Sequence, residues 1–93
     1  MILGMTRMSF HFHCQRIDAN RNMARYYTLA IEPTLFGETA VLRSWGRIGR
    51  RGGERTDAFG TEEEAVAHFL DLARRKRRKG YRPTKAAMPP VMA

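Results

Sequence analysis

The sequence predicts an α+β domain, an antiparallel β-sheet of about four strands with one amphipathic helix packed on one face. Four stretches with alternating side chains, separated by turn-forming residues, precede one stretch in which apolar residues recur at helical spacing. Because the strands follow one another in hairpin order, we expect the helix to cover the apolar face of the sheet. The opposite face is then expected to look at solvent or a ligand.

The first two strands are predicted at Ser9 to Ile17 and Tyr26 to Leu35. Alternate side chains of a strand point to opposite faces. The expected buried set is therefore Phe10, Phe12 and Cys14 in the first strand and Tyr27, Leu29 and Ile31 in the second. The segment between the strands, Asp18 to Arg25, is rich in turn formers and is expected to be a loop that carries Arg21 and Arg25.

The central strand is predicted from Val41 to Arg50, after a turn at Phe36 to Thr39. Its alternation places Val41, Arg43, Trp45 and Arg47 on one face and Leu42, Ser44, Gly46 and Ile48 on the other. We expect the second, small and apolar set to lie on the core. The first set then exposes the chain's only tryptophan between two arginines, a combination that suits a stacked base and phosphate oxygens. A tryptophan buried in the core is the alternative, and the residues alone leave both open.

A glycine-rich turn at Gly49 to Gly53 follows the central strand and carries Arg50 and Arg51. Such a turn can aim backbone N–H groups at phosphate, and it can equally be an ordinary hairpin turn with two solvated arginines. Gly46 leaves room for a close approach to the backbone beside Trp45. A short fourth strand is predicted from Glu54 to Phe59.

The helix is expected to begin at Thr61, which forms a capping-box pattern with Glu64. The apolar stripe comprises Ala65, Val66, Phe69, Leu70 and Ala73. The helix ends in the basic run Arg74, Arg75, Lys76, Arg77, Arg78 and Lys79. Gly80 suits the position after the helix, and Tyr81 is expected to fold back on the core. The basic run is either a solvated helix end or an arm that binds nucleic acid.

Neither a metal site nor an active site is predicted. His11 and His13 share one strand face, but Cys14 points to the other face, so a complete zinc ligand set is missing. Glu64 and His68, one helical turn apart, are the only pair that suggests catalysis, and helix neighbours of this kind are usually structural. We therefore expect a protein that is not an enzyme and has no cofactor.

Length and charge narrow the functional classes. The 93 residues allow one domain, expected at 9–82, between a disordered leader at 1–8 and a disordered tail at 83–93. The net charge of +8 predicts attraction to polyanions, with nucleic acid first. A single cysteine and no apolar run long enough to span a bilayer favour a cytoplasmic protein with no membrane partner.

Several motifs together resemble the WGR domain. They are Tyr26-Tyr27-Thr28-Leu29, Arg43-Ser44-Trp45-Gly46-Arg47-Ile48-Gly49, Glu64-Ala65 through His68-Phe69, and Lys79-Gly80-Tyr81. The family's domain is mainly an antiparallel sheet with a helix against it, and it is best known from DNA-damage-responsive poly(ADP-ribose) polymerases, where it binds DNA near a strand end. The resemblance implies that Trp45 packs on a terminal nucleotide and that Arg47 contacts backbone phosphate. A chain without a catalytic domain resembles the small bacterial members.

The leading hypothesis is thus a non-enzymatic module that binds nucleic acid, DNA more readily than RNA, at an end or a single strand. The candidate contacts are Trp45, Gly46, Arg47, Arg43, Arg50, Arg51, Arg74, Arg75, Arg77 and Arg78. Only Trp45 and Arg47 follow from the resemblance, whereas the other arginines follow from face, proximity and charge. The alternative is a protein-interaction module that docks on an acidic partner or a nucleic-acid enzyme.

Overall fold

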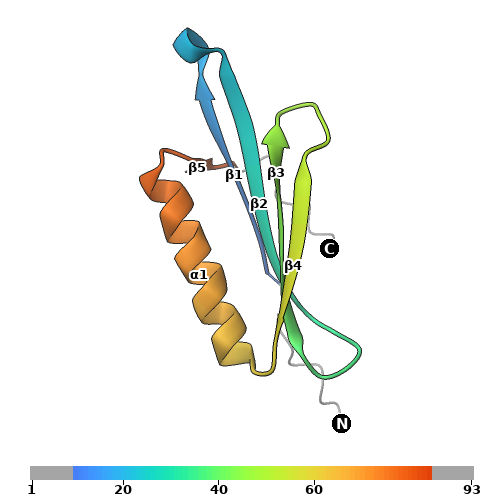
Figure 1. Cartoon of the computed structure of the whole chain (residues 1–93). Coiled ribbons are helices and arrows are strands. Elements are labelled where there is room, and N and C mark those ends of the chain that lie inside the picture. Colours follow the sequence, from blue (N-terminus) through green and yellow to red (C-terminus); the bar gives the residue numbers. More distant parts are fainter. Residues whose placement is uncertain (1–9, 85–93) are drawn as a thin grey trace, which may run out of the picture.

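The computed structural model describes residues 10–84, in which one helix packs against one antiparallel sheet (Figure 1). The elements follow in the order β1 Phe10–Asp18, the short 3-10 helix η2 Ala19–Arg21, β2 Met23–Pro33, β3 Thr39–Arg47, β4 Gly53–Phe59, α1 Glu62–Arg78 and β5 Arg82–Pro83. This confirms the predicted α+β class. The predicted leader at 1–8 and all but the first two residues of the predicted tail lie outside the described residues.

The sheet has five strands in the order β4-β3-β2-β1-β5, one more than the sequence predicted. The additional strand is the two-residue β5, which pairs with Cys14 and Gln15 of β1. A two-residue strand that contains proline has no periodicity to detect, and proline is tolerated there because β5 forms the edge of the sheet. The loop predicted at Asp18 to Arg25 is also shorter than expected, since β2 begins at Met23 and therefore includes Arg25.

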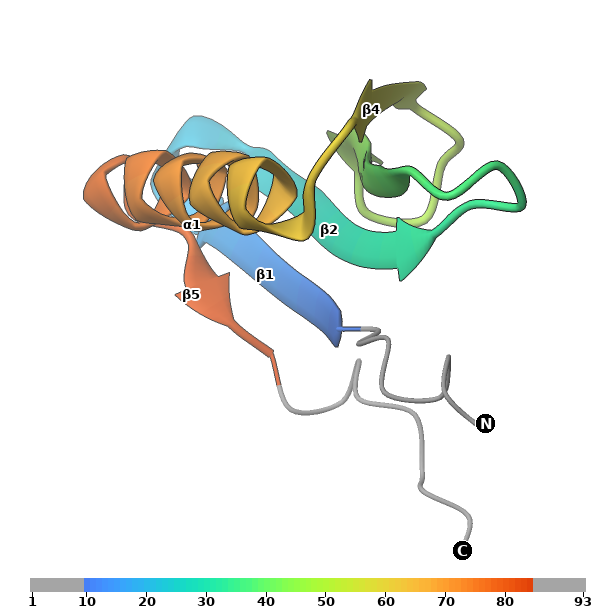
Figure 2. The ribbon, with the colours of Figure 1, turned by 90° about the horizontal axis from the view of Figure 1, so that it is seen from below.

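The helix crosses one face of the curved sheet, as the view from below shows (Figure 2). The strands β1, β2 and β3 each contribute alternate apolar side chains to the core between the sheet and the helix. The buried core consists of Cys14, Tyr27, Leu29, Ile31, Val41, Ala65, Leu72 and Tyr81, with Phe12, Phe59, Val66, Phe69 and Ala73 packed against it. The predicted apolar faces of β1 and β2 are therefore correct, although Phe10 at the start of β1 is 50 % exposed. The predicted helix stripe is correct only in part, since it omitted the buried Leu72 and included Leu70, which is 45 % exposed.

The start of α1 follows from its capping residues. Thr61 is the N-cap, and its Oγ1 accepts a hydrogen bond of 3.2 Å from the backbone N–H of Glu64. The Glu64 carboxylate accepts from the Thr61 hydroxyl at 3.2 Å rather than from the Thr61 N–H that the capping box predicts. Three glutamates in the first turn also complement the positive end of the helix.

The end of α1 is a Schellman motif. The N–H of Tyr81 donates to the Lys76 carbonyl and the N–H of Gly80 to the Arg77 carbonyl, each at 3.0 Å. Gly80 has a φ of 96°, a left-handed conformation that favours glycine. The turn sends Tyr81 back into the core, as predicted.

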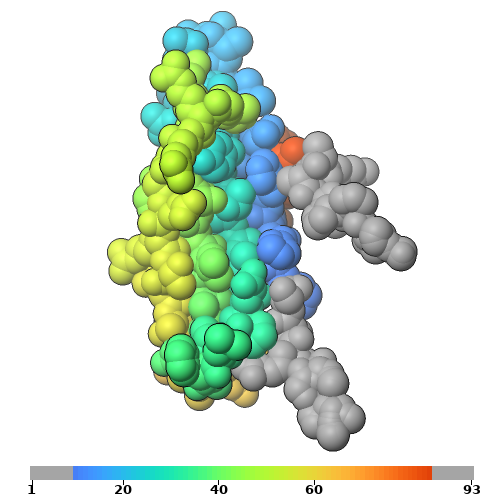
Figure 3. Space-filling view, turned by 90° about the vertical axis from the view of Figure 1, so that its right-hand side faces the viewer, coloured from blue at the N-terminus to red at the C-terminus, as the bar shows by residue number. Residues whose placement is uncertain are grey.

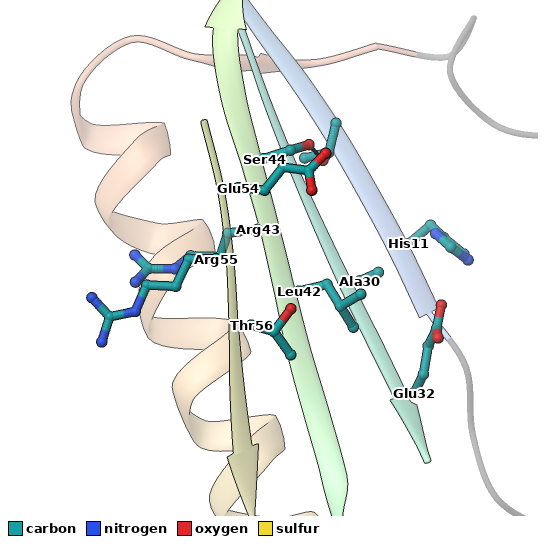
Figure 4. Close-up of a pocket in the computed structure, with 10 residues that line it drawn as sticks. His11, Ala30, Glu32, Leu42, Arg43, Ser44, Glu54, Arg55 and Thr56 are labelled. Carbon is teal, nitrogen blue, oxygen red and sulfur yellow. Dashed lines mark hydrogen bonds between the residues drawn. The ribbon is translucent and has the colours of Figure 1, made fainter. Parts of the chain in front are cut away.

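The second face of the sheet carries no helix and is viewed directly in Figure 3. His11 and His13 lie on this face, and the His13 ring stacks parallel to Tyr26 with the centroids 6.5 Å apart. Burial lowers the pKa of His13. A shallow hollow on this face is bordered by small, polar and acidic side chains, and Arg43 and Arg55 point away from it toward the helix (Figure 4). Within residues 10–84, no helix has both the length and the apolar character that are needed to cross a membrane.

Candidate nucleic-acid interface

Trp45 lies on the same face of the sheet as the helix, which overturns the predicted faces of the central strand. In the β2–β3 register, Tyr27 is opposite Trp45 and Ile31 is opposite Val41. The residues opposite one another share a face. Because the large apolar residues of β2 form the core with α1, Trp45 must share their side. The set that includes Leu42 and Ser44 was expected on the core and lies instead on the open face (Figure 4).

Arg43 therefore lies under the helix and does not project freely beside Trp45. Its side chain is only 19 % exposed, and its guanidinium lies 3.6 Å from the Asp57 carboxylate. Asp57 also contacts Arg55 at 3.1 Å and His68 at 3.5 Å. Burial alone would raise the pKa of Asp57, but the hydrogen bond from Arg55 and the surrounding cations lower it overall. Arg43 thus has an acidic partner within the protein, although it shares that carboxylate with Arg55 and His68.

Part of the Trp45 indole is exposed to solvent, since Trp45 lies near the end of β3. The side chain is 39 % exposed, so it is neither a core residue nor a free surface residue. Its ring lies directly over Gly53, where a Cβ atom would stand 2.6 Å from Cζ2. Gly53 therefore allows the indole to lie flat across the neighbouring strand.

Gly46 has a different role, in the packing of the β3–β4 turn. A Cβ at Gly46 would lie 2.9 Å from the Gly52 Cα and 3.2 Å from the Tyr26 hydroxyl. A Cβ at Gly52 would in turn lie 1.8 Å from the Trp45 carbonyl oxygen. The two backbones approach so closely that neither position has room for a side chain, which accords with the close approach predicted at Gly46.

Arg47 follows Trp45 on the same face and reaches the turn between β1 and β2. Its guanidinium donates hydrogen bonds to the backbone carbonyl of Asn22 at 3.2 Å and to the Asn22 Oδ1 at 3.3 Å. Arginine has five N–H donors, so Arg47 retains donors for a ligand. A hollow of about 410 Å³ opens beside it. The hollow is lined by Arg25, Trp45, Gly46, Arg47, Lys76 and Tyr81.

A second hollow of about 270 Å³ lies on the helix side of Trp45. It is lined by Tyr27, Arg43, Trp45, Leu72, Arg75, Lys76 and Lys79. The Lys76 ammonium lies 4.4 Å from the centroid of the Tyr27 ring and 5.2 Å from that of Tyr81. Burial, and next the charge of Lys79, lower the pKa of Lys76. Lys76 is thus held on aromatic rings in a positive environment.

The structure separates the predicted cations into two groups. Arg43, Arg47 and Arg75 line the hollows beside Trp45. The remaining predicted contacts line neither hollow and are exposed, either in the β3–β4 turn or on α1; they are Arg50, Arg51, Arg74, Arg77 and Arg78.

Three cations beside Trp45 are not among the contacts predicted from the sequence. Lys76 and Lys79 were included in the basic run but were not chosen as contacts, although Lys76 follows Leu72 by four residues on the same side of the helix. Arg25 was assigned to a loop, although it precedes Tyr27 by two residues and shares its face. Both spacings were visible in the sequence. Within residues 10–84, no group of three or more His, Cys, Asp or Glu residues could hold a metal ion.

Comparison with known proteins places these features in a family. The model of the WGR domain matches residues 10–88 of the chain. The chain is also 52 % identical over 79 residues to the uncharacterized protein y4dW of Sinorhizobium fredii. That match covers 85 % of this chain and 39 % of the relative, so the chain spans well under half of the relative's length.

Proposed function

The chain belongs to the WGR domain family, and from this membership we propose that it is a non-enzymatic module that binds nucleic acid beside Trp45. The family consists of binding modules of the nucleic-acid type. We propose DNA rather than RNA as the ligand, bound at an end or a single strand in the cytoplasm. The exposed Trp45 indole, bordered by cations, is the observation that carries the proposal.

The charge around Trp45 is largely uncompensated. Six cations line the two hollows, and no carboxylate is among the lining residues. Two of the six have partners, since Arg43 pairs with Asp57 and Arg75 pairs with Asp71 at 2.9 Å. The other four have no ion pair within residues 10–84; they are Arg25, Arg47, Lys76 and Lys79. A polyanion would supply the missing negative charge.

The chemistry of the two central residues supports the same ligand. The Trp45 indole offers a flat apolar surface on which a base can stack, and such stacking contributes about 1–3 kcal/mol per base. Arg47 offers its remaining N–H donors on the same face as that ring, two residues along the strand. A nucleotide with its base on Trp45 would bring its phosphate toward Arg47.

Binding can be measured by fluorescence anisotropy with four ligands of equal length: blunt duplex DNA, duplex DNA with an overhang, single-stranded DNA and single-stranded RNA. Trp45→Ala is expected to weaken binding by roughly 5-fold to 150-fold, which corresponds to the loss of one stacked base. Four neutralised phosphates predict a slope of log K against log salt of about −3.6 for duplex DNA and about −2.8 for single strands.

Arg82→Gln is the matched control for Arg47→Gln. The register places Arg82 opposite Gln15, on the face away from the helix. Arg47→Gln should weaken binding and reduce the salt slope by about 1, whereas Arg82→Gln should leave both close to wild type. Equal effects of the two substitutions would mean that overall charge, and not the Trp45 site, attracts the ligand.

A protein-interaction module is the second candidate function, and one observation favours it. Leu35 and Phe36, in the β2–β3 turn, are 96 % and 86 % exposed. The Thr34 hydroxyl holds this turn by accepting hydrogen bonds from the N–H groups of Phe36 at 3.1 Å and Glu38 at 3.2 Å. Two exposed apolar side chains on an ordered turn are typical of a docking contact, here to an acidic protein or a nucleic-acid enzyme.

The second candidate is tested by capture of a partner after nuclease treatment. A complex that survives the nuclease and is lost in a Leu35→Ser, Phe36→Ser double variant would support protein docking. A complex that disappears with the nuclease alone would count against it, because nucleic acid would then be the bridge.

A further inference from the structure

Three arginines lie side by side across the three central strands of the sheet. Arg16 of β1 is opposite Arg25 of β2, and Arg25 is opposite Arg47 of β3. All three follow the parity of Cys14, Tyr27 and Trp45, so they lie on the face that carries the helix. We refer to Arg16, Arg25 and Arg47 as the arginine row.

The arginine row lacks the negative charge that would normally accompany it. Like charges directly opposite one another on a sheet are destabilising. Among the described residues, none of the three arginines forms an ion pair with a carboxylate. The C-terminal end of α1 lies nearby, but a helix terminus supplies only about half of an elementary charge, which is too little for three guanidinium groups.

Two members of the arginine row, Arg25 and Arg47, are exposed near the C-terminal end of α1, whereas Arg16 is half-buried there. The β1–β2 hairpin extends past the last turn of α1 (Figure 1), and Arg25 and Arg47 border the open hollow beside Trp45. Arg16 lies next to Gly80, where a Cβ would stand 3.4 Å from the Arg16 Nε. The Schellman turn that ends α1 thus leaves room for Arg16.

The dimensions of the arginine row suit a phosphate chain. Neighbouring strands are about 4.8 Å apart, so the row spans roughly 10 Å across three strands. One strand of duplex DNA carries a phosphate about every 3.4 Å along the helix axis, and neighbouring phosphates are farther apart than this along the backbone, so the row can face two or three consecutive phosphates. Trp45 lies two residues from Arg47 along β3, beside the β3 end of the row.

We propose that the arginine row binds consecutive phosphates of one nucleic-acid strand, which crosses β3, β2 and β1 away from the base stacked on Trp45. This inference rests on the proposed function and adds a path and a direction to it. The strand runs perpendicular to the β-strands and passes the end of α1. The basic side chains on the exposed side of α1, Arg74, Arg77 and Arg78, are not required by this path.

The experiment compares Arg16→Gln and Arg25→Gln with Arg82→Gln, the control on the opposite face. With single-stranded DNA, each substitution in the row should weaken binding and reduce the magnitude of the log–log salt slope by about 0.7. Because the substitution also removes repulsion, Arg25→Gln should raise the melting temperature of the free protein by roughly 2–4 °C. Arg82→Gln should leave the affinity, the salt slope and the melting temperature close to those of the wild type.

A second probe, inorganic tripolyphosphate, tests phosphate binding by the arginine row with a ligand that has no base to stack on Trp45. It should raise the melting temperature of the wild type and of Trp45→Ala, but raise that of Arg25→Gln much less. If Trp45→Ala weakens DNA binding while both row substitutions bind as wild type, the phosphate path is wrong and the proposed function stands.

The two probes also reveal the case in which the proposed function fails and the phosphate site does not. If no nucleic acid binds but tripolyphosphate stabilises the wild type selectively, the row is a phosphate site and the proposed function is wrong. If neither probe distinguishes the row variants from Arg82→Gln, the arginine row has no role in binding.

Discussion

Gly53→Ala tests the site through a residue that the sequence shows only as part of a glycine-rich turn. The added Cβ would stand 2.6 Å from Cζ2, 2.7 Å from Cε2 and 2.9 Å from Nε1 of the Trp45 indole. Optimal carbon–carbon contacts are about 3.5–4.0 Å, so the ring must move by roughly 1 Å or tilt off the strand. Because the three nearest atoms all belong to the ring, the displacement should fall on the indole.

The expected result is weaker binding in a protein that is still folded. Stacking contributes about 1–3 kcal/mol, so a displaced ring should reduce affinity by about 5-fold or more. Replacing glycine by alanine within a strand gains about 0.5–1 kcal/mol of stability, which offsets part of the strain. The melting temperature should therefore change by no more than about 4 °C.

The assay uses Trp45 itself, since it is the only tryptophan in the chain. Its emission maximum should shift in Gly53→Ala, and anisotropy should report the loss of affinity. Gly60→Ala is the matched control, because a Cβ there would meet nothing within 4 Å. An emission spectrum and an affinity equal to those of the wild type would refute the placement of the indole on Gly53.

The remaining predictions concern the core and the ionised groups. Leu72→Ala, at a helix position only 5 % exposed, should destabilise the fold by about 2–5 kcal/mol, and a melting temperature within about 3 °C of wild type would contradict the core assignment. The lowered pKa of Asp57 implies stability that is present above about pH 4 and is lost as the pH falls through the lower, folded value. Asp57→Asn should therefore melt lower at pH 7 and lose less on acidification, and parallel melting curves from pH 7 to pH 2 would argue against this. Burial raises the pKa of Cys14 to about 11, so a thiol reagent at pH 8 should react slowly with the native protein and rapidly in urea, whereas rapid native labelling would contradict the burial.

Local patterns in the sequence were sufficient for four of the five strands, for the α-helix and for the alternation of side chains within those strands. The Thr61 cap and the Gly80 position bounded the helix correctly, because capping depends on residues a few positions apart. The alternation in each strand also grouped side chains correctly, so Trp45, Arg43 and Val41 do share a face. The family was recognisable from short motifs, and the match over residues 10–88 confirms it.

Only the tertiary structure decided which face of the central strand is covered. Both faces of β3 contain apolar residues, so alternation alone does not show which one points inward. The answer depends on register with β2, where Tyr27, Leu29 and Ile31 bring Trp45, Arg43 and Val41 to the helix side. The prediction of the opposite arrangement was wrong for this reason.

The same non-local information decided the composition of the candidate site. Arg16, Arg25 and Arg47 are distant in sequence and become neighbours only through strand pairing. The basic run on α1 is continuous in sequence, yet the helix turns Arg75, Lys76 and Lys79 toward Trp45 and leaves Arg74 and the others outside both hollows. The sequence by itself therefore determined the elements, the net positive charge and the family. The packing of the helix on one face determined which cations surround the tryptophan, because that depends on contacts between residues far apart in the chain.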